Sequence, residues 1–148
     1  IEAIQTVFAL IKSIVSDSII SETDSSLHVR SAARRQYRIE FAPDPDIAIR
    51  QVLDNGSLRN RIAIEVKGGT DFSNIHNRLG EAEKSHQKAR ADGFTQFWTV
   101  VNVAGLGRDV WKQESPTTNE LYVLHEITDP RSEEHLRFRE YLVSEIGI

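Results

Sequence analysis

The chain has 148 residues, 39% of them apolar, a formal net charge of −4 and no cysteine. This size favours a single domain, residues 1–148, and a start at isoleucine without any methionine leads us to expect a piece of a longer protein. The charge argues against a strongly basic nucleic-acid coat protein. The lack of cysteine excludes disulfides and cysteine-bound zinc, and no apolar run is long enough to cross a bilayer.

The N-terminal part is expected to form a helix, a loop and a first strand. Residues 1 to about 20 carry apolar side chains at helical spacing, which predicts one amphipathic helix. Residues 21–26 are polar and predict a loop, whereas residues 34–42 alternate as in a strand. Pro43 and Pro45 interrupt this strand, and their missing backbone donors suit a turn before the next one.

A β-hairpin is predicted next. Residues 47–53 and 58–66 are rich in β-branched side chains and alternate over most of their length. The Asn-Gly pair at 55–56 is the strongest short hairpin signal, because both residues tolerate positive φ. If these two residues form the loop, counting outward in register places Asp46 directly opposite Glu65.

This register gathers three charged side chains on one face of the hairpin. Asp46, Glu65 and Lys67 share that face with the small residues Ala48 and Ala63. The opposite face receives the apolar side chains of Ile47, Ile49, Ile62, Ile64 and Val66. A slip by one residue would bury the charges and expose the isoleucines, so only a bulge in the poorly alternating start of the second strand could change the pairing.

A polar helix and a buried strand are expected after the hairpin. Asp71, Ser73 or Asn74 can cap a helix that runs to about Ala91 and has few apolar side chains to bury. Because the helix follows the charged strand directly, its first turns should lie near the three charges. Residues 94–104 form the most apolar segment and predict a strand that is buried on both faces, as in a central or parallel position.

The C-terminal part completes a layered fold. Gly105 and Gly107 mark a turn, residues 120–127 alternate as a strand, and Asp129-Pro130 is expected to begin a last helix. The order is helix, three strands, helix, two strands, helix. It predicts an α/β fold of the three-layer sandwich type, with a mixed β-sheet flanked by helices.

Two carboxylates and a lysine at a sheet edge suit metal-dependent hydrolysis of a phosphodiester. Asp46 and Glu65 would hold Mg²⁺ through oxygen ligands, and the ion would activate a water and offset charge on the phosphate. Lys67 would orient the attacking water or help to deprotonate it. The competing explanation is a salt-bridged cluster on a solvated sheet face. The aligned acids, the Asn-Gly turn and the apolar back face favour the metal site.

These residues resemble the motif of the PD-(D/E)XK nuclease superfamily. The helix before the strands, the antiparallel pair, the polar helix and the buried strand agree with the core of that superfamily over most of residues 1–104. A more specific likeness lies in Ile-Glu-Val-Lys-Gly-Gly-Thr-Asp-Phe-Ser-Asn-Ile-His-Asn-Arg, which begins at Ile64. This segment is similar to type II restriction endonucleases, in particular to those of the XcyI type.

The resemblance implies an activity, a cofactor and partners. We expect site-specific, Mg²⁺-dependent cleavage of double-stranded DNA, with Mn²⁺ as a possible substitute, by a homodimer in a prokaryotic cytoplasm. Asp46 and Glu65 would bind the metal together with the Val66 carbonyl, and Lys67 would be the catalytic lysine. At 148 residues the chain is short for a restriction enzyme that carries its own specificity elements.

Other acidic residues near the motif leave alternatives open. The superfamily's Pro-Asp maps onto Pro43-Asp44 or Pro45-Asp46, and we prefer Asp46 because it aligns with Glu65. Asp44 has the same side-chain parity, so it is expected close to the metal ligands without being one. Glu81 is expected on a helix face that lines the site, unless it only forms surface pairs. An acid from the first helix would have to be Glu2 or Glu22, and neither position is compelling.

Four side chains are candidates for DNA contacts. Arg38 belongs to an arginine cluster just before the hairpin, although a solvated face would explain that cluster equally well. Asn77, Arg78 and Lys84 lie on the polar helix, where they would contact either the DNA backbone or base edges.

Two other functions compete with restriction cleavage. A repair or recombination nuclease, such as a junction resolvase, would use the same fold on a different substrate. A nuclease-like domain that only binds DNA or protein would need none of the catalytic residues, so the intact Asp46, Glu65 and Lys67 set argues against it.

Overall fold

The protein is described by a computed structural model that covers residues 2–148. Its centre is a seven-stranded sheet in the order β1-β2-β3-β4-β5-β6-β7. The strands are β1 (Ile19–Glu22), β2 (Ser26–Arg30), β3 (Gln36–Phe41), β4 (Ile47–Val52), β5 (Leu58–Lys67), β6 (Gln96–Val101) and β7 (Glu120–Val123). The helices are α1 (Glu2–Ile14), η1 (Ser16–Ser18), η2 (Phe72–Asn74), α2 (Ile75–Ala91), α3 (Arg108–Glu114), α4 (Leu124–Ile127) and α5 (Glu133–Ile146).

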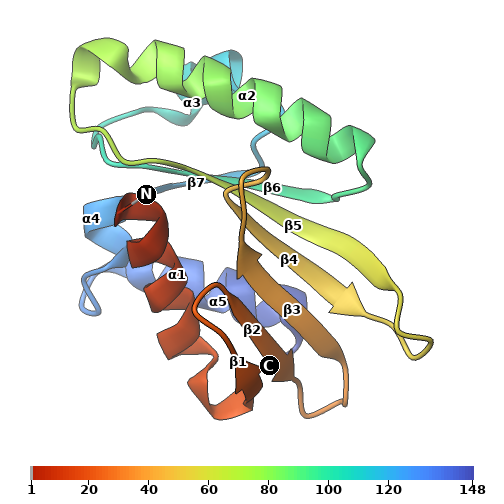
Figure 1. The fold of residues 1–148 in the computed structure, drawn as a ribbon. Helices are drawn as coiled ribbons and strands as arrows, with labels where there is room; N and C mark the ends of the chain where they lie inside the picture. The colour runs from red at the N-terminus through yellow and green to blue at the C-terminus, as the bar shows by residue number, and fades with distance from the viewer. Residues whose placement is uncertain (1) are drawn as a thin grey trace.

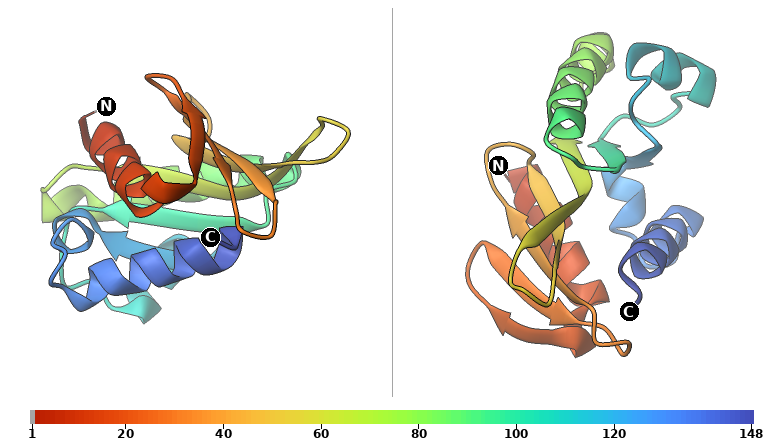
Figure 2. Two further views of the ribbon diagram at one scale, coloured as in Figure 1. Left: turned by 90° about the horizontal axis from the view of Figure 1, so that it is seen from below. Right: turned by 90° about the vertical axis from the view of Figure 1, so that its right-hand side faces the viewer.

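Helices cover both faces of this sheet (Figures 1 and 2). The helices α2 and α3 lie on one face, over β5, β6 and β7, whereas α1 and α5 lie on the other. Strands β1 to β5 pair antiparallel, and β5, β6 and β7 pair parallel, so the sheet is mixed. The predicted α/β class with a mixed sheet between helices is therefore confirmed.

The two faces of the hairpin have the characters that the alternation predicts. The isoleucines of β4 and β5 are fully buried in the main core, which they share with α1 and α5. On the other face, Ala48 and Ala63 pack in a small cluster with Ala89 of α2 and with Phe94 and Phe97. Because alanine side chains are short, α2 can lie close above the start of β4 and the end of β5.

The hairpin reaches the predicted register by a different route. Residues 54–56 form a three-residue loop, with Leu53 and Ser57 bonded across it and Gly56 at positive φ (85°), so the two-residue turn was wrong. A bulge between Ile49 and Arg50 of β4 then takes up one extra residue of β5. The two irregularities cancel, and Ile47 faces Ile64 just as the prediction requires.

The N-terminal prediction was wrong in its extent. The first helix ends at Ile14. Residues 19–22 form β1, although the first two of them were assigned to the helix and the last two to the loop. The segment 26–30, which was not assigned to any element, forms β2 and pairs with both β1 and β3. Leu27 and Val29 of β2 are fully buried, whereas three of the four β1 residues are exposed. Polar edge residues concealed this pair of strands in the sequence.

The C-terminal prediction also needs correction. The strand predicted over 120–127 ends at Val123, and the next four residues form α4. A short helix, α3, follows the predicted turn, and it buries Trp111 against α2 and β6. The last helix begins at Glu133 rather than near residue 129, because the Ser132 hydroxyl accepts a hydrogen bond from the backbone N–H of His135.

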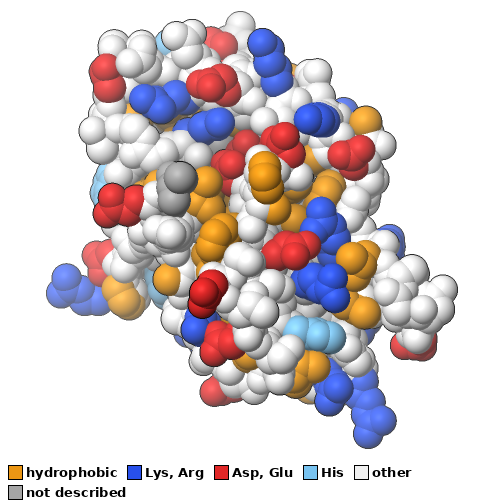
Figure 3. Space-filling model, viewed as in Figure 1, with side chains coloured by type: hydrophobic (Ala, Val, Ile, Leu, Met, Phe, Trp, Pro, Cys, Tyr) orange, Lys and Arg blue, Asp and Glu red, His pale blue; other side chains and the backbone are white. Residues whose placement is uncertain are grey.

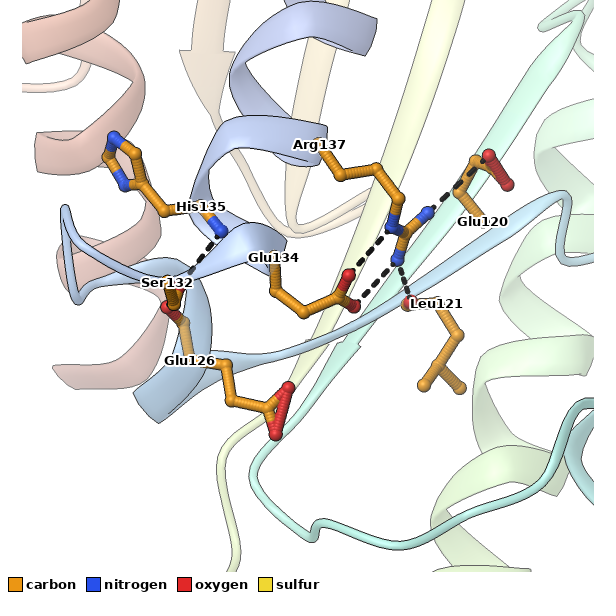
Figure 4. Close-up of polar contacts among 7 residues, drawn as sticks. All are labelled: Glu120, Leu121, Glu126, Ser132, Glu134, His135 and Arg137. Atoms are coloured by element: carbon orange, nitrogen blue, oxygen red, sulfur yellow. Dashed lines mark hydrogen bonds and ion pairs between the residues drawn. The ribbon is translucent and has the colours of Figure 1, made fainter.

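Arg137 of α5 covers the outer edge of the sheet (Figure 4). Its guanidinium donates to the Leu121 carbonyl of β7 at 2.8 Å, binds both oxygens of Glu134 at 3.0 Å and lies 3.6 Å from Glu120. It also stacks over the Tyr122 ring at 4.1 Å. An unpaired strand edge invites pairing with other chains, so this contact protects β7 from that side.

Within residues 2–148, no helix is both long enough and apolar enough to cross a membrane.

Candidate active site

The three predicted catalytic side chains meet where β4 begins and β5 ends. The Asp46 backbone N–H donates to Oε2 of Glu65 at 3.3 Å, and the Val66 N–H donates to Oδ2 of Asp46 at 2.9 Å. The Lys67 Nζ lies 4.0 Å from Oε1 of Glu65. The two strands thus hold each other's acid through a reciprocal pair of hydrogen bonds, and Lys67 follows on the same face.

The Glu65 carboxylate lies in an unfavourable place for a charge. Its residue is only 2% exposed, and burial together with the nearby Asp46 charge raises the Glu65 pKa to about 7, against the lowering effect of Lys67. Burial also raises the pKa of Asp46, although the Val66 hydrogen bond and Lys67 act in the opposite direction. Burial disfavours the ionised form of both acids, and a cation bound between them would offset this cost.

The donor set fits a hard divalent cation. The hydrogen bonds from the Asp46 and Val66 N–H groups use Oε2 of Glu65 and Oδ2 of Asp46. An ion would therefore be held by the other two oxygens, of which Oε1 of Glu65 lies 4.0 Å from Lys67. In residues 2–148 no group of three or more acidic, histidine or cysteine side chains could hold a metal. A cation here would therefore need main-chain or water oxygens as well, and the neighbouring Val66 carbonyl is the predicted one.

One side of α2 faces this site along a stripe of residues 78, 81, 85 and 88. The Ser85 hydroxyl lies near Glu65 and, as a hydrogen-bond donor, lowers its pKa. Lys88 lies 3.4 Å from Asp44, whose charge in turn raises the pKa of Asp46. Acidic and basic side chains gather beneath α2 on this face of the molecule (Figure 3). Asp44 therefore lies near Asp46, and its part in a metal site stays a prediction.

Arg78 begins this stripe and packs on the loop after Lys67. A side chain at Gly69 would overlap the Arg78 guanidinium, so the glycine leaves room for the arginine to lie directly on the backbone. The Arg78 Nε is buried and has no hydrogen-bond partner among residues 2–148. The guanidinium therefore lies just beyond the end of β5, and its Nε–H is a donor without a partner in the described part of the chain.

The other predicted contact residues lie farther from the three charges. Asn77, Glu81 and Lys84 are exposed on α2, with Glu81 in the stripe between Arg78 and Ser85. Arg38 is half-buried on β3, opposite Arg50 of β4 and so beyond the hairpin strand that carries Asp46. The structure brings Arg38 to the sheet face below α2 without bringing it to the acids.

The two candidate acids near the first helix differ in position. Glu22 lies on β1, at the far edge of the sheet, and its carboxylate forms an ion pair with Lys12 at 2.7 Å. Glu2 lines a hollow with Val66, Gly68 and Gly69, next to the end of β5. Glu2 is therefore the nearer of the two to the end of β5.

Sequence reasoning placed Ser85 with Glu81 on the helix face that lines the site, but it missed the contact of Lys88 with Asp44. Lys88 does not belong to the short motif, and a lysine is ordinary on an exposed helix. The usable signal was its spacing, because residues 78, 81, 85 and 88 repeat at three and four and therefore share one helix face.

Comparisons with known proteins agree with the motif. A family model described as XcyI restriction endonuclease matches residues 1–148. The chain is 49% identical over 143 residues to the type II restriction enzyme Cfr9I of Citrobacter freundii and, over the same length, to the type II restriction enzyme XcyI of Xanthomonas campestris pv. cyanopsidis. Each alignment covers 97% of this chain and 43% of the relative, so the chain spans less than half of either enzyme. No solved structure matches.

The raised pKa of Glu65 predicts a pH-dependent cost to stability in metal-free protein. A carboxyl whose folded-state pKa is raised stabilises the fold below its ordinary pKa of 4.5, and this contribution is lost as the pH rises through about 7. Glu65→Gln should therefore raise the free energy of unfolding by roughly 2 kcal/mol at pH 8.5 and change it little at pH 4.5. Denaturant unfolding in chelator at both pH values measures this. The control is Asp24→Asn, in the exposed turn between β1 and β2, and an equal gain from both variants would contradict the prediction.

Proposed function

Because the chain belongs to the XcyI restriction endonuclease family, we propose that it carries the catalytic centre of a Mg²⁺-dependent, site-specific endonuclease acting on double-stranded DNA. The observation that carries this proposal is the meeting of Asp46, Glu65 and Lys67 at the ends of two paired strands. The relatives are named as type II restriction enzymes, which favours this function over a junction resolvase.

The residues have separate parts in the proposed reaction. Asp46, Glu65 and the Val66 carbonyl would hold the ion, and Mn²⁺ would substitute for Mg²⁺ at oxygen ligands of this kind. When bound, the ion lowers the pKa of a water and offsets negative charge on the phosphate. Lys67 has its ammonium 4.0 Å from Glu65, so it can orient the attacking water and stabilise charge on the phosphate oxygens.

Burial prepares the two acids for this task. Before a cation binds, Glu65 with a pKa of about 7 holds a proton in a fraction of molecules near neutral pH. Binding of the cation must displace that proton, so affinity for the metal should rise with pH through this range. Ser85 and the Asp46 N–H, which both lower the pKa of Glu65, keep its carboxylate oriented toward the site.

The DNA would lie across the face below α2. Arg78 and Lys84 would contact backbone phosphates, and Asn77 has the donor and acceptor needed for either a phosphate or a base edge. Arg38 on β3 would meet a more distant phosphate of the same duplex. We expect a homodimer, because a palindromic site presents the same half-site twice and a two-fold symmetric protein reads both.

Replacement of the lysine should separate cutting from binding. Lys67→Ala is expected to abolish Mg²⁺-dependent cleavage, because it removes the cation beside the reacting phosphate, while leaving thermal stability and DNA affinity nearly unchanged. Cleavage of supercoiled plasmid and a gel-shift titration in Ca²⁺ measure the two properties. Lys12→Ala, whose side chain pairs with Glu22 at the far edge of the sheet, is the matched control. Undiminished cleavage by Lys67→Ala would remove the motif from consideration.

Site specificity has a direct experiment. Purified full-length protein should convert plasmid DNA with Mg²⁺ into a fixed set of discrete fragments, because a restriction enzyme cuts only at its recognition sequence. A smear would indicate an unspecific nuclease, and cutting confined to branched DNA would favour the repair function.

Arg78 should act on the DNA backbone rather than on bases. Each phosphate contact contributes about one unit to the slope of log affinity against log salt. Arg78→Ala is therefore expected to reduce this slope by about one and to weaken cognate and non-cognate DNA equally. Fluorescence anisotropy at several salt concentrations measures both effects. The control is Arg131→Ala, which replaces an exposed arginine in the segment between α4 and α5. An unchanged slope with relaxed sequence preference would instead indicate a base contact.

A further inference from the structure

Behind the active site, α2 inserts a buried carboxylate into the structure. Glu83 accepts hydrogen bonds from the Thr117 N–H at 2.8 Å, the Thr117 hydroxyl at 2.7 Å, the Gln87 amide at 2.7 Å and the Ser115 hydroxyl at 3.3 Å. Burial raises the pKa of Glu83, but these donors outweigh it and lower the pKa below its ordinary value. Glu83 is therefore ionised, and neutral groups satisfy its oxygens.

A chain of side-chain hydrogen bonds leads from this carboxylate into the sheet. The Ser115 hydroxyl contacts that of Thr118 at 2.7 Å, and Thr118 contacts the Thr99 hydroxyl at 2.8 Å. Thr99 in turn contacts Nε2 of His86 at 2.9 Å. All members of the chain are buried, and His86 returns it to α2, one turn after Glu83. The chain thus joins α2, β6 and the segment before β7.

The direction of every proton in this chain follows from its charged end. An ionised carboxylate can only accept, so Ser115 donates to Glu83 and must accept from Thr118. Thr118 has then used its proton, so Thr99 donates to it, and Thr99 must accept from His86. His86 therefore carries its proton on Nε2. Within residues 2–148 its buried Nδ1 makes no hydrogen bond of normal geometry, although a contact between the ring and the Trp98 backbone raises the His86 pKa. Burial also lowers the His86 pKa to about 4, so the ring is neutral.

The far end of the chain lies directly behind the metal ligands. Thr99 of β6 is the register partner of Glu65 in the parallel ladder, so the two side chains stand next to each other on the face below α2. His86 follows Ser85, the residue whose hydroxyl lies near Glu65. The height of α2 above Thr99 therefore sets the distance between Ser85 and Glu65.

We propose that the hydrogen-bond chain from Glu83 to His86 is a positioning device for the catalytic centre, which sets α2 at the height where Ser85 orients Glu65. The inference rests on the proposed function, because it assigns these residues a part in metal binding by Glu65. They are positioning residues, since neither Glu83 nor His86 touches the metal ligands in the described contacts.

Stability alone is a poor reason for this arrangement. Removing an ionised carboxylate from water is expensive, and apolar side chains of similar volume would pack α2 against the sheet at least as firmly. Apolar packing, however, tolerates small sliding movements, whereas a directed chain of hydrogen bonds has one geometry. A site whose metal ligand needs a fixed position therefore gains from a directed chain of hydrogen bonds.

Thr99 offers the sharpest test, because its hydroxyl and its methyl group can be removed in separate variants. Thr99→Val keeps the volume and breaks the chain, whereas Thr99→Ser keeps the hydroxyl and removes a methyl. We expect Thr99→Val to weaken Mn²⁺ binding to the full-length, DNA-free protein about tenfold, the usual effect of losing a partner behind a metal ligand. Thr99→Ser should bind Mn²⁺ like the parent protein. Isothermal titration calorimetry measures both, and steady-state cleavage should show a lower kcat with unchanged KM for DNA.

Two further variants separate positioning from general loss of stability. Thr118→Val breaks the chain one link farther from Glu65, so its effect should equal that of Thr99→Val, and the double variant should be no worse. Val29→Ala, in the core on the opposite face of the sheet, destabilises the fold without touching the chain. If Val29→Ala weakens Mn²⁺ binding as much as Thr99→Val at a similar loss in Tm, or if Thr99→Val binds normally, the inference is overturned.

Failure of the proposed function would look different. Asp46→Asn removes a proposed metal ligand, so it should abolish Mn²⁺ binding. Normal binding by Asp46→Asn would overturn the proposed metal site and the positioning role with it. Loss of binding in Asp46→Asn together with normal binding in Thr99→Val would overturn the positioning role alone. A metal-free readout is the imidazole ¹⁵N spectrum, in which His86 should carry its proton on Nε2, and a proton on Nδ1 would contradict the derived chain.

Discussion

Glu65 is almost fully buried at the end of β5, with the Asp46 carboxylate beside it. Burial raises the pKa of both acids, and the Asp46 charge raises the Glu65 pKa further. Two neighbouring carboxylates in a poorly solvated place cost free energy unless something holds them there. Here the backbone does so, because each strand donates an N–H to the acid of the other. The rest of the fold serves this pair: isoleucines bury the far face of the hairpin, and alanines on the near face admit α2.

Helix α2 connects this pair with everything else in the proposed site. In its stripe, Ser85 lies near Glu65 and Lys88 pairs with Asp44. Arg78 packs on Gly69 in the loop after β5. The buried chain from Glu83 holds the opposite side of the same helix to β6. These two sets of contacts explain why α2 has so many polar side chains: some face the acids, and others form the buried hydrogen-bond chain.

The register of the β4–β5 hairpin could be predicted from the local sequence. The structure has this register, although it differs from the prediction at two places whose effects cancel. The loop has three residues instead of two, and the bulge beside Arg50 restores the pairing of Ile47 with Ile64. The strong alternation of the isoleucines explains why the pairing survives, since any other register would bury charge. Alternation failed where strands are short and exposed, as in β1, and where a helix follows a strand without a break, as in α4.

The sequence by itself determined the hairpin, its two faces and the identity of the three central residues, because period-two alternation and an Asn-Gly turn act over a few neighbouring residues. Only the tertiary structure decided which α2 side chains face Glu65, that Glu2 lies nearer than Glu22, and that Glu83 is linked to His86. These contacts join segments far apart in the chain, such as Glu83 with Thr117 and His86 with Thr99. Their distances depend on how a helix packs on a sheet, which no local pattern of residues specifies.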